Sequence, residues 1–189
     1  ITPEFAHIPL IHNERGEKLS KRDGKSSLLE FKKEGFLPDA MLNYLARLGW
    51  GYKDEEFFNL NQAISWFTLD SVGKSPSRFD MKKLLHISKK HLISKPTDEV
   101  HDLLLQYLEF QKNISLSETS SEKLRRFLPL VVERCNTLGE IFDASSFLFA
   151  ADEVTNKKAL ALLDDKSKKI LSDFVSAIES KSFFWNSKF

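Results

Sequence analysis

The segment Lys18-Leu19-Ser20-Lys21-Arg22 places three cationic side chains and one hydroxyl group within five residues. Gly16 and Gly24 flank the segment and permit backbone conformations that other residues resist. A mobile loop of this composition can close over a polyanion and neutralise negative charge that develops in a transition state. Taken alone, a short run of Lys and Arg is more typical of a solvated surface loop. The sequence around it has to decide between these two interpretations.

Two further patterns follow the basic segment. Ser27 and Glu30 have the spacing of a capping box, which predicts a short helix that ends at Gly35. The stretch Phe36-Leu37-Pro38-Asp39-Ala40-Met41-Leu42-Asn43-Tyr44-Leu45-Ala46-Arg47-Leu48-Gly49-Trp50 predicts a second helix, which begins after Pro38 and stops at Gly49. A third motif is Val72-Gly73-Lys74-Ser75-Pro76-Ser77-Arg78-Phe79-Asp80, and its Asp80 can cap a further helix.

Together, in this order and spacing, the three motifs resemble the bacterial-type glutamyl-tRNA synthetases, which are class I aminoacyl-tRNA synthetases. Lys18-Leu19-Ser20-Lys21-Arg22 is similar to their KMSKS signature loop. The resemblance implies a C-terminal fragment of a glutamate–tRNA ligase, whose parent activates glutamate with ATP and transfers it to tRNA(Glu). The fragment would supply the signature loop and contacts to the tRNA stem and anticodon. The His-Ile-Gly-His type ATP signature is absent from this chain, so the fragment alone is expected to be inactive.

The resemblance also implies roles for the loop residues. Lys21 is the expected main transition-state contact, and Lys18 and Ser20 complete the expected catalytic set. Lys21, Lys18 and Arg22 are expected to bind the ATP phosphates. ATP with Mg²⁺ is expected as the cofactor of the full-length parent, and no cofactor is expected on the fragment alone. ATP and glutamate would bind through the upstream catalytic domain, and tRNA(Glu) is the expected macromolecular partner.

A basic stretch runs from Lys74 to Lys95, where seven Lys and Arg residues accompany a single acid, Asp80. Such a stripe is expected of a phosphate-backbone contact, although a lysine-rich helix face kept soluble by its charge has the same composition. The resemblance favours RNA. The expected tRNA-binding residues are Arg78, Lys82, Lys83, Lys89, Lys90, His91 and Arg134. Ser88 stands where relatives often carry Asn, which puts in doubt any contact made by that Asn.

The predicted fold is mainly α. Residues 1–26 would be the end of a nucleotide-binding catalytic domain, 27–97 a helical stem-contact domain, and 98–189 a truncated first helical anticodon-binding domain. Thr97 or Asp98 can cap a helix, and the Ser-rich residues 112–122 predict a loop. Pro129 predicts a kink or a helix start, and Thr137 with Glu140 predicts another capping box. A last helix would carry its apolar residues on one face: Ile170, Leu171, Phe174, Val175 and Ile178.

The composition of the chain restricts the classes of protein to which it can belong. The 189 residues carry a net charge of +1 and 41% hydrophobic residues, as expected of a soluble globular chain. No secretory signal and no apolar run of about 20 residues is visible, so a cytoplasmic monomer without a membrane partner is expected. One cysteine and five poorly spaced histidines predict no metal site. Two alternatives stay open, namely a stand-alone helical RNA-binding module without catalysis and a purely structural helical scaffold.

Overall fold

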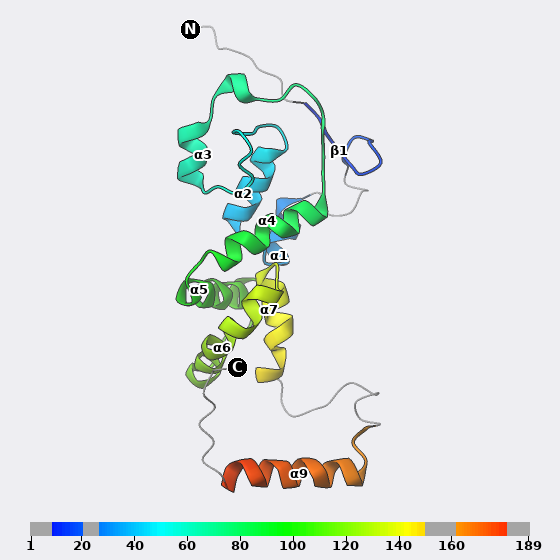
Figure 1. Cartoon of the computed structure of the whole chain (residues 1–189), viewed down its shortest axis with the longest axis vertical. Coiled ribbons are helices and arrows are strands. Elements are labelled where there is room, and N and C mark those ends of the chain that lie inside the picture. The colour runs from blue at the N-terminus through cyan, green and yellow to red at the C-terminus, as the bar shows by residue number, and fades with distance from the viewer. Residues whose placement is uncertain (1–8, 21–26, 150–161, 181–189) are drawn as a thin grey trace. The chain divides into compact units, whose positions relative to one another are not determined.

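The computed structural model describes residues 9–20, 27–149 and 162–180. These residues fall into two compact units, one within 1–149 and one within 150–189. The described part is mainly helical, as predicted (Figure 1). None of its helices is both long and apolar enough to cross a membrane.

Short helices build the first unit, and two strands of two residues each accompany them. The strands are β1 (Ile11–His12) and β2 (Ser77–Arg78), which pair in parallel with Ile11 opposite Ser77 and His12 opposite Arg78. The first helices are α1 (Leu28–Lys33), α2 (Pro38–Arg47), α3 (Leu60–Trp66), the 3₁₀ turn η1 (Leu69–Ser71) and α4 (Met81–Ile93). They are followed by α5 (Thr97–Tyr107), the π-helical turn η2 (Leu108–Lys112), α6 (Glu118–Val131), η3 (Val132–Arg134), α7 (Leu138–Ser145) and η4 (Ser146–Leu148).

The capping residues confirm several predicted helix starts. Ser27 and Glu30 form the predicted capping box at the start of α1. The Asp80 side chain accepts a hydrogen bond from the backbone N–H of Lys83 and caps α4. Thr137 caps α7, but the carboxylate of Glu140 accepts from the N–H of Asn136, so the predicted box is only half formed. These local patterns could be predicted because both partners lie within one turn of chain.

Two local predictions were wrong, and a third was wrong in part. Neither Thr97 nor Asp98 caps α5, because the helix already begins at Thr97 and Pro96 takes the cap position without a side-chain bond. The Ser-rich loop is shorter than predicted, since Ser117 accepts from the N–H of Ser120 and starts α6 at Glu118. Pro129 does not start a helix, because it lies inside the last turn of α6, and the alternative prediction of a kink at Pro129 stays a prediction.

Helix α3 was not predicted, although Asn59 and Gln62 form a complete capping box at its start. It lies in a long excursion of the chain, residues 50–72, that starts after the end of α2 and returns to the same place. Trp50 pairs with Val72, and the N–H of Gly73 donates to the carbonyl of Gly49 at 2.7 Å. The ring of Trp50 packs edge-on against Phe58, with 5.5 Å between ring centroids, which holds the excursion on the end of α2.

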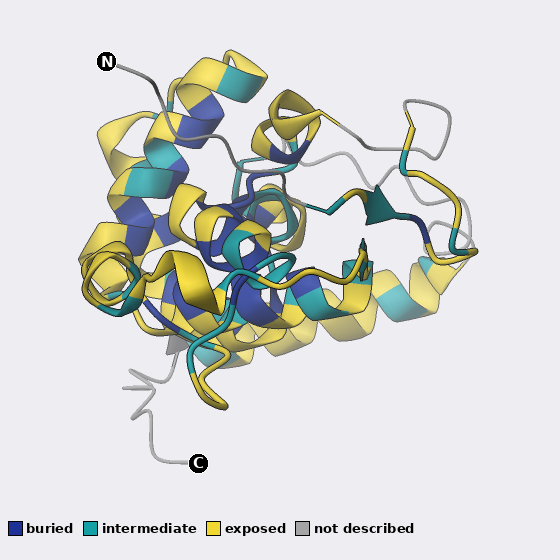
Figure 2. Cartoon of the chain, turned by 90° about the horizontal axis from the view of Figure 1, so that it is seen from above, coloured by how far each residue is buried: buried dark blue, intermediate teal, exposed yellow. Residues whose placement is uncertain are grey.

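Buried residues gather where the helices face each other, and the outer faces are exposed (Figure 2). The larger core cluster joins Leu37 of the α1–α2 connection and Leu92 of α4 to residues of α5, α6 and α7, such as Leu104, Leu128 and Ile141. A smaller cluster around Tyr44 lies between α2 and α4. One core therefore crosses the position, 97/98, at which we placed a domain boundary from the sequence, and that boundary stays a prediction.

Two glycines bring the α1–α2 turn into contact with the start of α7. Gly35 has φ +81°, and a Cβ placed on it would lie 2.5 Å from the backbone N of Gly139. A Cβ on Gly139 would lie 2.5 Å from the carbonyl O of Glu34. The N–H of Leu138 donates to the carbonyl of Gly35 at 2.9 Å, and the Tyr107 hydroxyl donates to the carbonyl of Lys33 at 2.9 Å. The approach is possible only because neither glycine has a side chain.

The second unit contributes α9 (Asp165–Ser180). The predicted apolar side chains of this helix are present, and Ile170, Leu171, Phe174 and Val175 are all exposed. The aromatic residues at the end of the chain lie outside the described residues.

The close approach of the two glycines predicts a large loss of stability for Gly35→Ala. The matched control is Gly16→Ala, because Gly16 has the same φ of +81° but its Cβ would meet only the Arg78 side chain, at 3.6 Å. The control should lose about 1–2 kcal/mol from left-handed strain alone. Gly35→Ala should lose clearly more, measured by urea denaturation of this chain. Equal losses would show that the backbone contact with Gly139 contributes nothing.

Candidate signature loop and nucleic-acid interface

The basic segment begins on a hairpin that is anchored to β1. Lys18 pairs antiparallel with His12, and the N–H of Leu19 donates to the carbonyl of Ile11 at 2.9 Å. The side chains of Lys18 and Ser20 are exposed. Lys21 and Arg22, the other predicted phosphate-binding residues, lie outside the described residues. The capping box of Ser27 and Glu30 at the start of α1 follows the predicted loop in the sequence.

Helix α4 has one basic face. Lys82, His86 and Lys90 are exposed, whereas Leu84, Ile87, Ser88 and Leu92 are buried on the opposite side. At 100° per residue, the four lysines of this helix and His86 lie within an arc of about 120°. Lys82, Lys89 and Lys90 form no ion pair with any other described residue. The structure therefore brings four of the predicted tRNA-binding residues to one solvent-facing surface, Lys82, Lys83, Lys89 and Lys90.

An acid that sequence reasoning missed joins this surface from another segment. The carboxylate of Glu56, in the connection between α2 and α3, accepts from the Lys83 ammonium at 3.0 Å and lies 3.6 Å from the Arg47 guanidinium. The bond to Lys83 and its charge lower the pKa of Glu56, with smaller contributions from Arg47 and Lys90. Glu56 therefore neutralises part of the basic face, and a phosphate would have to compete with it for Lys83.

His91 does not fit its predicted contact with tRNA, because the residue is only 4% exposed. Its Nε2 lies 3.0 Å from Oδ1 of Asn43, and the ring packs against Phe57. Asn43 Oδ1 also accepts from the N–H of Phe58, while Nδ2 donates to the carbonyl of Glu56. Oδ1 is thus an acceptor, so His91 Nε2 donates. His91 is a core residue that joins α4 to α2 and to the segment before α3.

Two other cations of the basic stretch lie outside α4. Lys95 lies between Asp39 of α2 and Glu99 of α5, at 3.3 Å and 2.5 Å. Burial would lower the pKa of Lys95, but these two carboxylates raise it overall. Arg78 is exposed on β2, and its guanidinium lies beside Gly16 at the hairpin turn. Arg78 therefore lies beside the hairpin formed by residues 11–19, which we call the signature hairpin. The lysines of α4 form a separate surface.

Ser88, which stands where the resemblance leads us to expect Asn, has a clear structural role. Its Oγ is buried and donates to the carbonyl of Asn136 at 2.6 Å, which ties α4 to the connection between η3 and α7. Cys135, which precedes Asn136 in the chain, is buried, and burial raises the pKa of its thiol, helped by Glu140 and opposed by Lys89. Arg134 precedes Cys135 and is exposed. Because Asn136, two residues further along the chain, bonds to Ser88 of α4, Arg134 lies close to α4.

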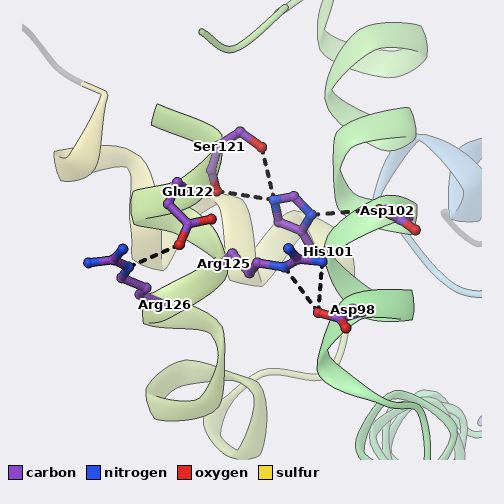
Figure 3. Close-up of polar contacts among 7 residues, drawn as sticks. All are labelled: Asp98, His101, Asp102, Ser121, Glu122, Arg125 and Arg126. Atoms are coloured by element: carbon purple, nitrogen blue, oxygen red, sulfur yellow. Dashed lines mark hydrogen bonds and ion pairs between the residues drawn. The ribbon is translucent and has the colours of Figure 1, made fainter. Parts of the chain in front are cut away.

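Four charged side chains of α5 and α6 form two ion pairs (Figure 3). Arg125 donates to Oδ1 of Asp98 from both Nε and Nη2, at 3.0 and 2.9 Å. Arg126 pairs with Glu122 one turn away on the same helix. The buried His101 ring contacts the carbonyl and hydroxyl of Ser121 through Nε2. Arg134, by contrast, forms no ion pair with another described residue.

Metal sites and apolar grooves are the other kinds of site to consider. The described part of the chain contains no cluster of three or more His, Cys, Asp or Glu side chains that could hold a metal ion. A groove of about 820 Å³ lies between α1, α2 and the end of α5, and its lining is largely apolar, as at Leu42, Leu45 and Phe110. No residue of α4 lines it, so the groove is separate from the basic face.

The comparisons with known proteins agree with the motifs and with the fold. Residues 1–86 match the family model for the catalytic domain of class I tRNA synthetases (E and Q), and residues 99–188 match an anticodon binding domain. A glutamate–tRNA ligase of Pelagibacter ubique is 40% identical over 172 residues, which is 91% of this chain and 37% of that protein. The chain belongs to the class I glutamyl-tRNA synthetase family.

Other members of the glutamyl-tRNA synthetase family support the assignment. A glutamate–tRNA ligase 2 of Paramagnetospirillum magneticum is 42% identical over 171 residues, which cover 90% of this chain and 34% of that protein. A solved glutamate tRNA ligase from Elizabethkingia meningosepticum, in complex with its amino acid, superposes with a TM-score of 0.72 at 26% identity. It covers 95% of this chain, which spans 39% of that structure. The chain thus spans little more than a third of its relatives in this synthetase family.

Burial of His91 predicts a pH-dependent stability. Burial lowers its pKa, with Asp39 raising it less and Lys95 lowering it. Below the ordinary value of about 6.5, the unfolded chain therefore binds more protons at this position than the folded chain, and stability falls as the pH falls. His91→Asn should remove this part of the difference in unfolding free energy between pH 7.5 and 5.5.

The control for this measurement is His86→Asn, because His86 is exposed on the same helix. It should keep the wild-type pH dependence. A wild-type dependence that survives in His91→Asn would contradict the assignment. The comparison uses slopes against pH, since His91→Asn also removes packing and lowers stability at every pH.

Proposed function

We propose that this chain is the part of a glutamate–tRNA ligase that supplies the signature loop and the contacts to the tRNA body. The parent would activate glutamate with ATP and transfer it to tRNA(Glu). The observation that carries the proposal is the placement of Lys18 on an anchored hairpin in the same compact unit as the basic face of α4. The membership of the family, and the anticodon-binding match from residue 99, support it.

In the proposed reaction the signature loop acts on the triphosphate of ATP. Lys21 would stabilise the charge that develops on the phosphates, and Lys18, Ser20 and Arg22 would assist it. ATP, its Mg²⁺ ion and glutamate would be bound mainly by the remainder of the parent. The parent would be a cytoplasmic monomer.

The basic face of α4 would bind the phosphate backbone of the tRNA between acceptor and anticodon. Its exposed lysines have no competing acid except Glu56 among the described residues, and phosphate contacts position an RNA without reading its sequence. Arg78 would contact the backbone nearer the signature hairpin. Arg134 could read a base edge through its planar guanidinium, but its place beside α4 favours a backbone contact over an anticodon contact.

The relatives do not favour a stand-alone RNA-binding module without catalysis, because the Pelagibacter and Paramagnetospirillum proteins are glutamate–tRNA ligases. A purely structural scaffold would leave the lysines of α4 without a ligand. Measurement of tRNA binding separates that scaffold from the proposed function.

Reversal of Lys82, Lys83, Lys89 and Lys90 to Glu should weaken binding to all tRNAs alike. The slope of log affinity against log salt should flatten by up to about 0.9 for each phosphate that the variant no longer neutralises.

Glu56→Gln should act in the opposite direction and strengthen binding, because it frees Lys83 from its carboxylate. Glu55→Gln is its matched control, since Glu55 is exposed and forms no ion pair within the described residues. Unchanged affinity in the four-lysine variant would leave α4 as a merely solvated face.

Lys21→Ala in the full-length parent should slow adenylate formation about 10²–10³-fold, by analogy with the removal of one oxyanion-hole donor. ATP affinity should change much less, because the contact strengthens only as charge develops. ATP–pyrophosphate exchange with saturating tRNA measures both. Lys123→Ala, at an exposed lysine of α6, is the control.

The isolated 189-residue chain should show no ATP–pyrophosphate exchange. Exchange by this chain alone would refute the proposal that the remainder of the parent binds ATP and glutamate.

A further inference from the structure

The turn that leads into the basic segment is built around one side chain. Asn13 is 8% exposed, although Glu14 and Arg15 beside it are exposed. Its Oδ1 accepts from the backbone N–H groups of Arg15 and Glu17, both at 3.0 Å. Its Nδ2 donates to the Glu17 carboxylate at 3.2 Å. Its own N–H donates to the carbonyl of Glu17 at 2.8 Å, so side chain and backbone together close the turn.

Closure of this turn determines where Lys18 leaves the hairpin. Lys18 follows Glu17 directly and lies opposite His12, and Leu19 is bonded to Ile11. The His12 carbonyl in turn accepts from the N–H of Phe79 at 2.8 Å, next to β2. The backbone of Lys18 is therefore held on the sheet while its side chain is exposed. Without the Asn13 side chain, two amide groups of the turn would lose their acceptor.

Asn13 also controls the nearest acid. Glu17 is adjacent to Lys18, and a free carboxylate at this position would compete with a phosphate for the lysine. The bond from Asn13 Nδ2 holds the Glu17 carboxylate on the turn. Within the part of the chain that the structure describes, no carboxylate forms an ion pair with Lys18. The lysine is thus presented with its charge available.

We propose that Asn13 is a positioning residue for adenylate formation, which acts by fixing the hairpin from which Lys18 is presented to the phosphates of ATP. The inference rests on the proposed function. A cation that is already in place stabilises developing charge without reorganisation, and a displacement of about 1 Å can cost about 10²-fold in rate. Asn13 itself touches no substrate in this proposal.

The test uses the full-length parent with three single substitutions. Asn13→Ala should lower kcat of ATP–pyrophosphate exchange by about 10- to 100-fold, while the KM for glutamate and the affinity for tRNA stay unchanged. Asn13→Asp should recover only part of the rate, because a carboxylate oxygen can accept from both amide groups but the donor that holds the Glu17 carboxylate is lost. Asn59→Ala removes a similar side-chain bond, to the N–H of Gln62 at 2.9 Å, from the cap of α3, and should keep the wild-type rate.

Hydrogen exchange supplies a second readout that does not depend on activity. The amide of Leu19 should exchange faster in Asn13→Ala than in wild type or in Asn59→Ala, because the hairpin opens more often. A wild-type kcat in Asn13→Ala, an equal loss in Asn59→Ala, or a loss without faster exchange at Leu19 would each overturn the positioning role. A wild-type parent without any ATP–pyrophosphate exchange activity would instead refute the proposed function, and this inference with it.

Discussion

The contact between the backbones of Gly35 and Gly139 is the constraint on which the first unit depends. At this contact the α1–α2 turn touches the start of α7, and a side chain on either residue would prevent it. Residues that match two different family models therefore share one hydrophobic core, from Leu37 through Leu92 to Ile141. The signature hairpin, the basic helix and the exposed Arg134 consequently lie within one compact unit.

Helix α4 has to satisfy two opposing demands within 13 residues. Its outer face carries lysines, while its inner face buries Leu84 and Leu92 together with two polar residues. Both buried polar residues have partners, since Ser88 donates to Asn136 and His91 donates to Asn43. Because a buried polar group without a partner is costly, these two bonds fix the rotation of the helix. The same bonds thereby fix which side chains face the solvent.

Local signals in the sequence were sufficient to predict the starts of α1, α4 and α7 and the basic stretch on α4, although the capped helix α3 was missed. Ser27, Asp80 and Thr137 act on residues within one turn, so their patterns are readable without a fold. The ionic surroundings could not be predicted in the same way. Glu56 meets Lys83 from 27 residues away, and Lys95 meets acids of two different helices. Similarly, basic composition alone could not distinguish the buried His91 from its exposed neighbours.

The pairing of Trp50 with Val72 has a consequence for how this protein can vary. The chain leaves the end of α2 at Gly49 and returns at Gly73, and a backbone hydrogen bond joins these two residues. Lengthening such a closed excursion is cheap, since each doubling of loop length costs only about 0.6 kcal/mol. Its exposed turn at Lys53 could therefore accept inserted residues, or an inserted reporter, while the hairpin and α4 keep their places. Diversity among homologues is expected to accumulate there.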